Sequence, residues 1–228
     1  MKTESILYAV TPHDLAGHRL RITLTIAEPD PAGQVLAMPA WIPGSYLIRD
    51  FARQVETIEA HCNDRPVGMR KLDNHRWRCD PCRGPLVVQY VVYAWDLSVR
   101  GAHVDETHAF FNGTSVFLAV VGQESSPCHV LLQPPPGVPD WTVHTSLPEA
   151  QGHELAAARQ GFGMYLAPDY DALVDHPVEM GRPQVVTFEA CGARHEMVFT
   201  GVIPNLDLER IAEDVRRICE AQIEFFEP

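Results

Sequence analysis

The chain has 228 residues, of which 46% are hydrophobic and 21% charged, a composition typical of folded globular proteins that excludes intrinsic disorder. Its formal net charge is −12, and its only lysines are Lys2 and Lys71. Nucleic acids and anionic lipids bind basic surfaces, so this acidic chain is not expected to bind either of them.

The sequence also lacks the segments that direct a protein into or across a membrane. No apolar run approaches the roughly 20 residues that a membrane-spanning helix needs. The first residues, 1–6, have none of the apolar character of a signal peptide. Six cysteines are too few for a small disulfide-stabilised fold. We therefore expect a cytoplasmic protein with reduced thiols and no membrane partner.

Alternating polar and apolar residues are frequent in the first two thirds of the chain. Residues 19–26 follow this period-two pattern, which predicts a strand with one buried face. Residues 86–95 are rich in β-branched and aromatic side chains, which predicts a strand buried on both faces. Shorter strands are expected at residues 6–10, 35–38, 54–60, 75–79, 116–121, 128–132 and 141–144. We therefore predict a mainly β protein whose residues 1–170 form an antiparallel β-sandwich.

A single long helix is expected near the end of the chain, at residues 206–226. Its apolar positions, spaced as on one helix face, are Leu208, Ile211, Ala212, Val215, Ile218 and Cys219. A short helical turn is expected at residues 169–173, and strands at residues 184–190 and 195–201. Because little else in the sequence is left to cover the apolar helix face, residues 171–228 resemble the opening of a second domain. We expect the chain to self-associate through residues 206–226.

Two short motifs are explained most simply as turns. Cys79 and Cys82 have the spacing of a zinc-binding arm or a redox pair, but the prolines around them indicate a turn between strands. No second cysteine pair completes a zinc site. Asn112 and Gly113 are typical of a tight hairpin turn, because both residue types tolerate a positive φ.

The densest group of potential metal ligands lies at residues 103–108, with His103, Asp105, Glu106 and His108. Imidazole and carboxylate groups suit zinc or manganese. A polar loop between two strands explains the same residues and is the interpretation that we favour. The alternative is a small metalloenzyme that uses His103, Asp105 and His108. The zinc-protease motif His-Glu-x-x-His is absent, since neither His-Glu pair, at residues 153–154 and 195–196, is followed by the second histidine.

Aromatic and arginine side chains crowd around a Pro-Gly-Ser turn in residues 41–53. The segment reads Trp41-Ile42-Pro43-Gly44-Ser45-Tyr46-Leu47-Ile48-Arg49-Asp50-Phe51-Ala52-Arg53. It resembles the signature of the glycyl-aminopeptidase family of zinc metallopeptidases, which carry a C-terminal PDZ domain. Residues 97–100 and 105–117 resemble the second landmark of the same family, and the two motifs occur in the same order.

The resemblance implies an N-terminal β-domain, then a thermolysin-like catalytic domain, then the PDZ domain. Residues 1–170 would be the N-terminal domain. Residues 171–228 would be the first strands and one long helix of the catalytic domain, truncated before its zinc motif. The chain would thus be the non-catalytic N-terminal region of a zinc aminopeptidase that removes small residues such as Gly or Ala from peptides. It would shape the active-site cleft and dock the catalytic domain.

In this interpretation zinc and the peptide substrate belong to the full-length enzyme. No catalytic or zinc-binding residue of the family maps onto this chain, so we expect it to hold no metal and no cofactor and to be inactive alone.

Four polar residues of the two motifs are our candidates for functional contacts. Asp105 and Asn112 carry carboxylate and amide oxygens, which suit the charged amine at a substrate's N-terminus. Tyr46 and Arg49 are expected to hold their loop against the catalytic domain. The alternative function is an independent β-sandwich module that binds peptide or carbohydrate.

Overall fold

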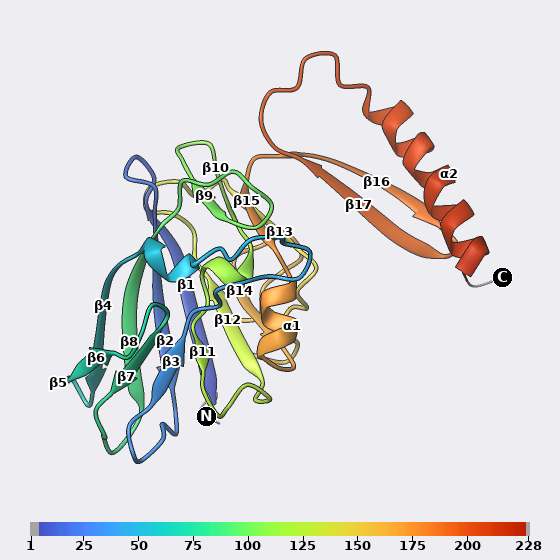
Figure 1. The fold of residues 1–228 in the computed structure, drawn as a ribbon. Coiled ribbons are helices and arrows are strands. Elements are labelled where there is room, and N and C mark those ends of the chain that lie inside the picture. Colours follow the sequence, from blue (N-terminus) through green and yellow to red (C-terminus); the bar gives the residue numbers. More distant parts are fainter. Residues whose placement is uncertain (1–4, 227–228) are drawn as a thin grey trace. The chain divides into compact units, whose positions relative to one another are not determined.

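The computed structural model describes residues 5–226 and divides the chain into two compact units (Figure 1). The first unit ends at Met180 and the second begins at Gly181. The first unit thus includes the short helix α1 (Tyr170–Asp175) and most of strand β15 (Val178–Gly181), which lie beyond the boundary expected at residue 170. Within residues 5–226, no helix combines the length and the apolar character that crossing a bilayer requires.

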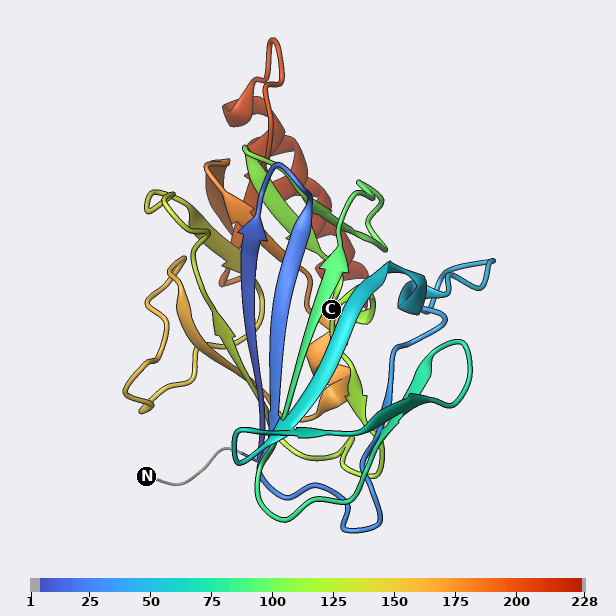
Figure 2. The same ribbon diagram turned by 90° about the vertical axis from the view of Figure 1, so that its left-hand side faces the viewer.

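A seven-stranded sheet is the largest element of the first unit, with strand order β14-β12-β1-β2-β8-β4-β5. In chain order its strands are β1 (Ile6–Asp14), β2 (Arg19–Ile26), β4 (Val55–Cys62), β5 (Arg65–Val67), β8 (Leu86–Tyr93), β12 (Cys128–Leu132) and β14 (Gly163–Ala167). Neighbouring strands are antiparallel, except that β1 and β12 run parallel. Figure 2 shows β1, β2, β8 and β4 side by side.

Two four-stranded sheets complete the first unit. One has the order β11-β3-β7-β6 and contains β3 (Val35–Ala37), β6 (Met69–Lys71), β7 (Arg76–Cys79) and β11 (Ala119–Val120). The other has the order β13-β15-β10-β9 and contains β9 (Ala102–Val104), β10 (His108–Phe111), β13 (Thr142–Thr145) and β15. Side chains from all three sheets meet in one hydrophobic core, for example Ile22, Leu36 and Phe111. The predicted mainly β fold is confirmed.

Period-two alternation explains how the large sheet forms its core face. In β2 the side chains of Leu20, Ile22, Leu24 and Ile26 are fully buried, whereas the residues between them are partly or fully exposed. A strand places successive side chains on opposite faces, so this pattern buries one face only.

Three tyrosine hydroxyls form hydrogen bonds to the buried backbone carbonyls of residues 116–118, which lie outside any sheet. The carbonyls of residues 116–118 accept hydrogen bonds from the hydroxyls of Tyr90, Tyr170 and Tyr8, at 2.8, 2.7 and 2.7 Å respectively. Unpaired carbonyls inside a protein are costly, so these hydroxyls replace the partners that a sheet would supply. We call Tyr8, Tyr90 and Tyr170 the tyrosine cluster.

The second unit consists of a β-hairpin and a long helix. Strands β16 (Gln184–Ala190) and β17 (Ala193–Phe199) pair antiparallel, and α2 (Leu208–Phe226) packs on β16. Arg216 of α2 forms ion pairs with Glu213 and Glu220, at 2.7 Å each. The predicted helix is confirmed, although none of its described residues is fully buried.

Two strand predictions are wrong in part. Strand β8 alternates buried and partly exposed residues, and Gln89 is exposed, so it is buried on one face rather than both. β-branched and aromatic side chains favour strands whether or not both faces are covered. Of the strand expected at residues 116–121, only β11 forms, because the tyrosine cluster engages the carbonyls of residues 116–118.

The hairpin turn expected at Asn112 and Gly113 is also absent. Asn112 has a φ of −84° and caps the short 3₁₀ helix η2 (Gly113–Ser115) instead. A second 3₁₀ helix, η1 (Phe51–Gln54), precedes β4. In α2, Ile218 was expected on the apolar face but is 60% exposed.

Candidate functional site

Most of the first sequence motif and residues 97–100 of the second lie on neighbouring loops of the first unit, whereas residues 105–117 of the second motif contain β10 and η2. The first loop, residues 38–50, connects β3 to η1, and the second, residues 94–101, connects β8 to β9. Arg100 of the second loop donates a hydrogen bond from Nη2 to the carbonyl of Gly44 in the first, at 3.1 Å. We call these two segments the motif loops.

Ser45 organises the first motif loop from its centre. Its side chain and backbone are buried, its carbonyl accepts a hydrogen bond from Nε1 of Trp41 at 2.8 Å, and its Oγ accepts one from Nε of Arg49 at 2.9 Å. Arg49 therefore stabilises its own loop. The adjacent Tyr46 is fully exposed, so the two docking candidates differ in their surroundings.

Large apolar side chains project into solvent from both motif loops. Their exposed fractions range from 46% for Trp41 to 101% for Tyr46. Together they form what we call the apolar loop surface: Trp41, Tyr46, Leu47, Ile48, Trp95, Leu97 and Val99. Monomeric proteins rarely expose so many large apolar residues on adjacent loops, which is typical of a surface that contacts another part of the protein or a partner.

An open groove of about 660 Å³ lies between the first motif loop and α1. Its acidic and amide residues are Asn112, Asp169, Asp171 and Asp175, and Trp41 is among its apolar residues. Asp169 caps α1 by accepting a hydrogen bond from the amide of Ala172. Asp171 and Asp175 are exposed, and their carboxylates make the groove acidic.

The two substrate-contact candidates lie at opposite ends of β10, and the structure does not bring them into one group. Asn112 accepts hydrogen bonds at Oδ1 from the amide and hydroxyl of Thr114, at 3.1 and 2.6 Å. Asp105 accepts two from Thr107 and one from the amide of His108. Partial burial opposes ionisation of Asp105, yet hydrogen bonds from Thr107 and from His103 hold its pKa well below the usual range.

Four aromatic rings form a row beside Asp105. Trp95 stacks on His18 with ring centroids 3.7 Å apart and on His103 at 4.7 Å, and His103 lies 5.0 Å from His108. Nδ1 of His108 donates to Glu179 at 3.0 Å, and this bond raises the pKa of His108 although partial burial opposes the shift. The spacing in the sequence groups His103, Asp105 and His108, but it does not indicate that Trp95, His18 and Glu179 lie beside them.

The sequence alone indicates where the side chain of Glu179 points, but not which strand lies next to it. Glu179 stands between the buried residues Val178 and Met180 of β15, so strand alternation alone indicates that its side chain points away from the core. Nothing in the local sequence indicates that β15 is the neighbour of β10.

Cys79 and Cys82 show none of the properties of a redox pair. Both are free thiols, and Cys79 is fully buried at the end of β7. Burial raises the pKa of Cys79 to about 12 and that of Cys82 to about 11, whereas a reactive thiol requires a lowered pKa. The structure therefore favours the turn interpretation of this motif.

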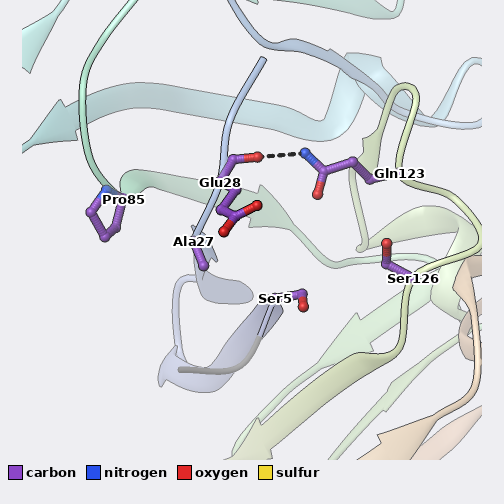
Figure 3. A pocket seen from close by; sticks show the side chains of 6 residues that line it. All are labelled: Ser5, Ala27, Glu28, Pro85, Gln123 and Ser126. Atoms are coloured by element: carbon purple, nitrogen blue, oxygen red, sulfur yellow. Dashed lines mark hydrogen bonds between the residues drawn. The ribbon is translucent and has the colours of Figure 1, made fainter. Parts of the chain in front are cut away.

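A second open pocket, of about 540 Å³, lies beside the end of β2 (Figure 3). Pro85, one of its lining residues, precedes β8, whereas the second motif loop follows that strand. The lining residues of the pocket are Ser5, Ala27, Glu28, Pro85, Gln123 and Ser126, and Gln123 donates to the carbonyl of Glu28 at 2.8 Å. With one ionisable side chain, Glu28, this lining offers no group of reactive residues.

Comparison with known proteins identifies the family. The sequence model of the peptidase M61 N-terminal domain matches residues 7–182. The chain belongs to the peptidase M61 N-terminal domain family. It is thus the N-terminal part of a metallopeptidase, as the motif resemblance implied. No curated protein sequence matches the chain.

Solved structures extend the similarity of this M61 N-terminal region beyond residue 182. An aminopeptidase N family protein from Idiomarina loihiensis is 40% identical, with a TM-score of 0.91 over 97% of this chain. The match covers 37% of that protein, so this chain spans little more than a third of its solved relative. An M1 zinc metallopeptidase from Deinococcus radiodurans is 13% identical, with a TM-score of 0.50. The match covers 99% of this chain and 53% of that protein, and the similarity is one of fold alone.

Proposed function

We propose that residues 1–228 are the non-catalytic N-terminal region of a cytoplasmic zinc aminopeptidase, and that the apolar loop surface docks the remainder of that enzyme. The observation that carries the proposal is the exposure of seven large apolar side chains on two loops joined by the bond between Arg100 and Gly44. The length of the solved relative supports it, since most of that protein lies outside the matched region.

Within this proposal, the second unit, residues 181–228, begins a thermolysin-like catalytic domain that continues beyond the chain, and a PDZ domain follows it. Neither His-Glu pair of this chain fits a catalytic zinc site of that kind, because residues 153–154 and 195–196 both lie outside helices. His195, which precedes Glu196, lies on strand β17 and stacks on Phe188 with ring centroids 4.9 Å apart, whereas the motif requires a helix. The catalytic zinc is therefore assigned to the remainder of the enzyme.

The groove beside α1 suits the substrate's N-terminal end. Asp171 and Asp175 make it acidic, and a peptide N-terminus carries a positive charge that carboxylates stabilise. Asn112 lines this groove, which supports its role as a substrate contact. Asp105 accepts four hydrogen bonds around its own turn, which favours a positioning role there over direct contact with substrate.

The docking proposal is tested by producing the 228-residue chain and the remainder of the full-length protein separately and measuring their association by calorimetry. Ile48→Asp and Leu97→Asp place charges on the apolar loop surface and should weaken association at least tenfold. Leu155→Asp is the matched control, because Leu155 is 51% exposed but lies outside the motif loops. If the unaltered chain and the three variants bound the remainder of the enzyme with equal affinity, docking through these loops would be contradicted.

The substrate proposal is tested in the full-length enzyme with glycyl and alanyl anilides. Asn112→Ala and Asp171→Asn should lower kcat/KM several-fold while the melting temperature stays unchanged. Asp64→Asn, which removes an exposed carboxylate outside the groove, is the control. If kcat/KM changes only in step with thermal stability, the two residues have structural roles.

A further inference from the structure

We propose that His103, Asp105 and His108 form a binding site for a divalent transition-metal ion of the zinc class, separate from any catalytic zinc. The three residues come from the end of β9, the following turn and the start of β10. This proposal departs from our sequence-based expectation that the chain holds no metal, and it goes beyond the docking function.

Strand pairing places the three side chains on one face of a hairpin. His103 pairs with Phe110, and Ala109 pairs with Val104. Alternation then directs His103, Asp105 and His108 to the same side, opposite the buried Ala109. A rigid two-strand support of this kind positions ligands more reliably than a flexible loop does.

The distances fit an ion after a small adjustment. One donor atom from each of the three side chains lies within 4.8 Å of the other two. Ligands of one tetrahedral zinc ion lie roughly 3 to 3.5 Å apart, so side-chain rotations that move these atoms by about an ångström complete the site. Asp105 is already fixed by Thr107 and by the amide of His108.

The chemistry of the donors selects the ion. Two imidazoles and one carboxylate match the ligands of zinc and its transition-metal neighbours, whereas calcium and magnesium prefer oxygen ligands alone. The fourth position would be left to water, because Asp105 has a side-chain exposure of 29% and opens the site to solvent.

The surroundings of the two histidines also resemble a metal site. Glu179 accepts a hydrogen bond from Nδ1 of His108, and carboxylates commonly orient ligating imidazoles through the nitrogen that does not bind the metal. His103 is 3% exposed and stacks on Trp95, which holds its ring in place. Its Nε2 lies 3.1 Å from Oδ2 of Asp105, so a bound ion would take the place of the hydrogen bond between these two ligands.

The test measures zinc binding to the purified 228-residue chain after treatment with a chelator and its removal. Calorimetric titration with zinc chloride should show one ion per chain. His108→Gln and Asp105→Asn should weaken binding at least tenfold, and Glu179→Gln about tenfold through loss of the outer hydrogen bond. The visible spectrum of bound Co²⁺ should change in parallel.

Two matched controls separate this site from other zinc ligands. His75→Gln removes a histidine that also pairs with an aspartate, Asp73, at 3.4 Å, and Cys82→Ser removes a thiol near Cys62. Both should bind zinc as the unaltered chain does, and all variants should melt cooperatively without metal. The proposal would be overturned if the unaltered chain bound no zinc or if His108→Gln bound zinc as tightly as the unaltered chain. Loss of zinc binding in Cys82→Ser would also overturn it.

Discussion

The hydroxyl of Tyr170 in α1 donates a hydrogen bond to the carbonyl of Phe117, 2.7 Å away in the buried segment after η2. Tyr170→Phe would leave this carbonyl without its donor, so we expect a loss of about 1 to 3 kcal/mol in the free energy of unfolding. Urea denaturation followed by circular dichroism measures the change. Tyr46→Phe is the control, because Tyr46 is fully exposed. Equal effects of the two substitutions would contradict the assigned role.

We expect the first unit to lose stability as the pH rises above about 10. Burial raises the pKa of the phenols of Tyr8, Tyr90 and Tyr170, whereas in the unfolded chain they ionise near pH 10. A group with a raised pKa contributes its full stability below the unfolded value and loses it at higher pH. Each phenol then lowers the unfolding free energy by up to about 1.4 kcal/mol per pH unit. Denaturation at several alkaline pH values should show a smaller slope for Tyr8→Phe, and an unchanged slope would contradict this explanation.

Thiol reactivity should follow exposure rather than the CxxC spacing. Cys191 is exposed, whereas Cys79 and Cys128 are fully buried with their pKa values raised to about 12 by burial. In the native protein at mildly alkaline pH, iodoacetamide should modify Cys191 first and leave Cys79 and Cys128 unmodified until the chain is denatured. Peptide mass mapping measures the order. Rapid formation of a disulfide between Cys79 and Cys82 under mild oxidation would contradict it.

We propose that the 228-residue chain self-associates through residues 206–226. Ile218 and Phe225 of α2 are 60% and 77% exposed, and exposed apolar faces of this kind favour association. Ile218→Glu and Phe225→Glu should shift the chain toward the monomer in sedimentation experiments at high concentration. Val202→Glu serves as the control, because Val202 is 94% exposed but lies outside the helix. A chain that is monomeric at every concentration would refute the proposal.

Local periodicity predicted much of the fold. The pattern at residues 19–26 matches β2 residue for residue, and the apolar spacing after residue 206 matches α2. Two predictions failed where distant residues decide the local structure. Residues 116–118 lie outside any strand because hydroxyls from β1, β8 and α1 engage their carbonyls. Gly113 lies in η2 rather than in a hairpin turn, and it packs so closely against α1 that a Cβ there would lie 2.7 Å from Cα of Val174.

The candidate sites were likewise predictable where local sequence determines them and not where distant residues do. The first motif loop could be found from its aromatic and arginine residues, residues 97–100 of the second from the family resemblance, and the three potential metal ligands from their spacing. That Tyr46 is exposed while Arg49 binds Ser45 could not be predicted, because it depends on how the loop folds back on itself. The pairing of His108 with Glu179 likewise depends on a sheet neighbour 71 residues away.

The parallel pairing of β1 with β12 has a consequence for synthesis of the chain. β1 and β2 can form a hairpin as soon as residue 26 has left the ribosome, but the other edge of β1 stays open until β12 emerges. The hydrogen bond from the hydroxyl of Tyr8 to the carbonyl of Leu118 likewise cannot form until Leu118, 110 residues later, has been synthesised. An open strand edge is a template for wrong pairing, and such distant contacts slow folding. We therefore expect the nascent first unit to be prone to wrong pairing until β12 emerges, and a chaperone that shields the edge of β1 should raise its yield.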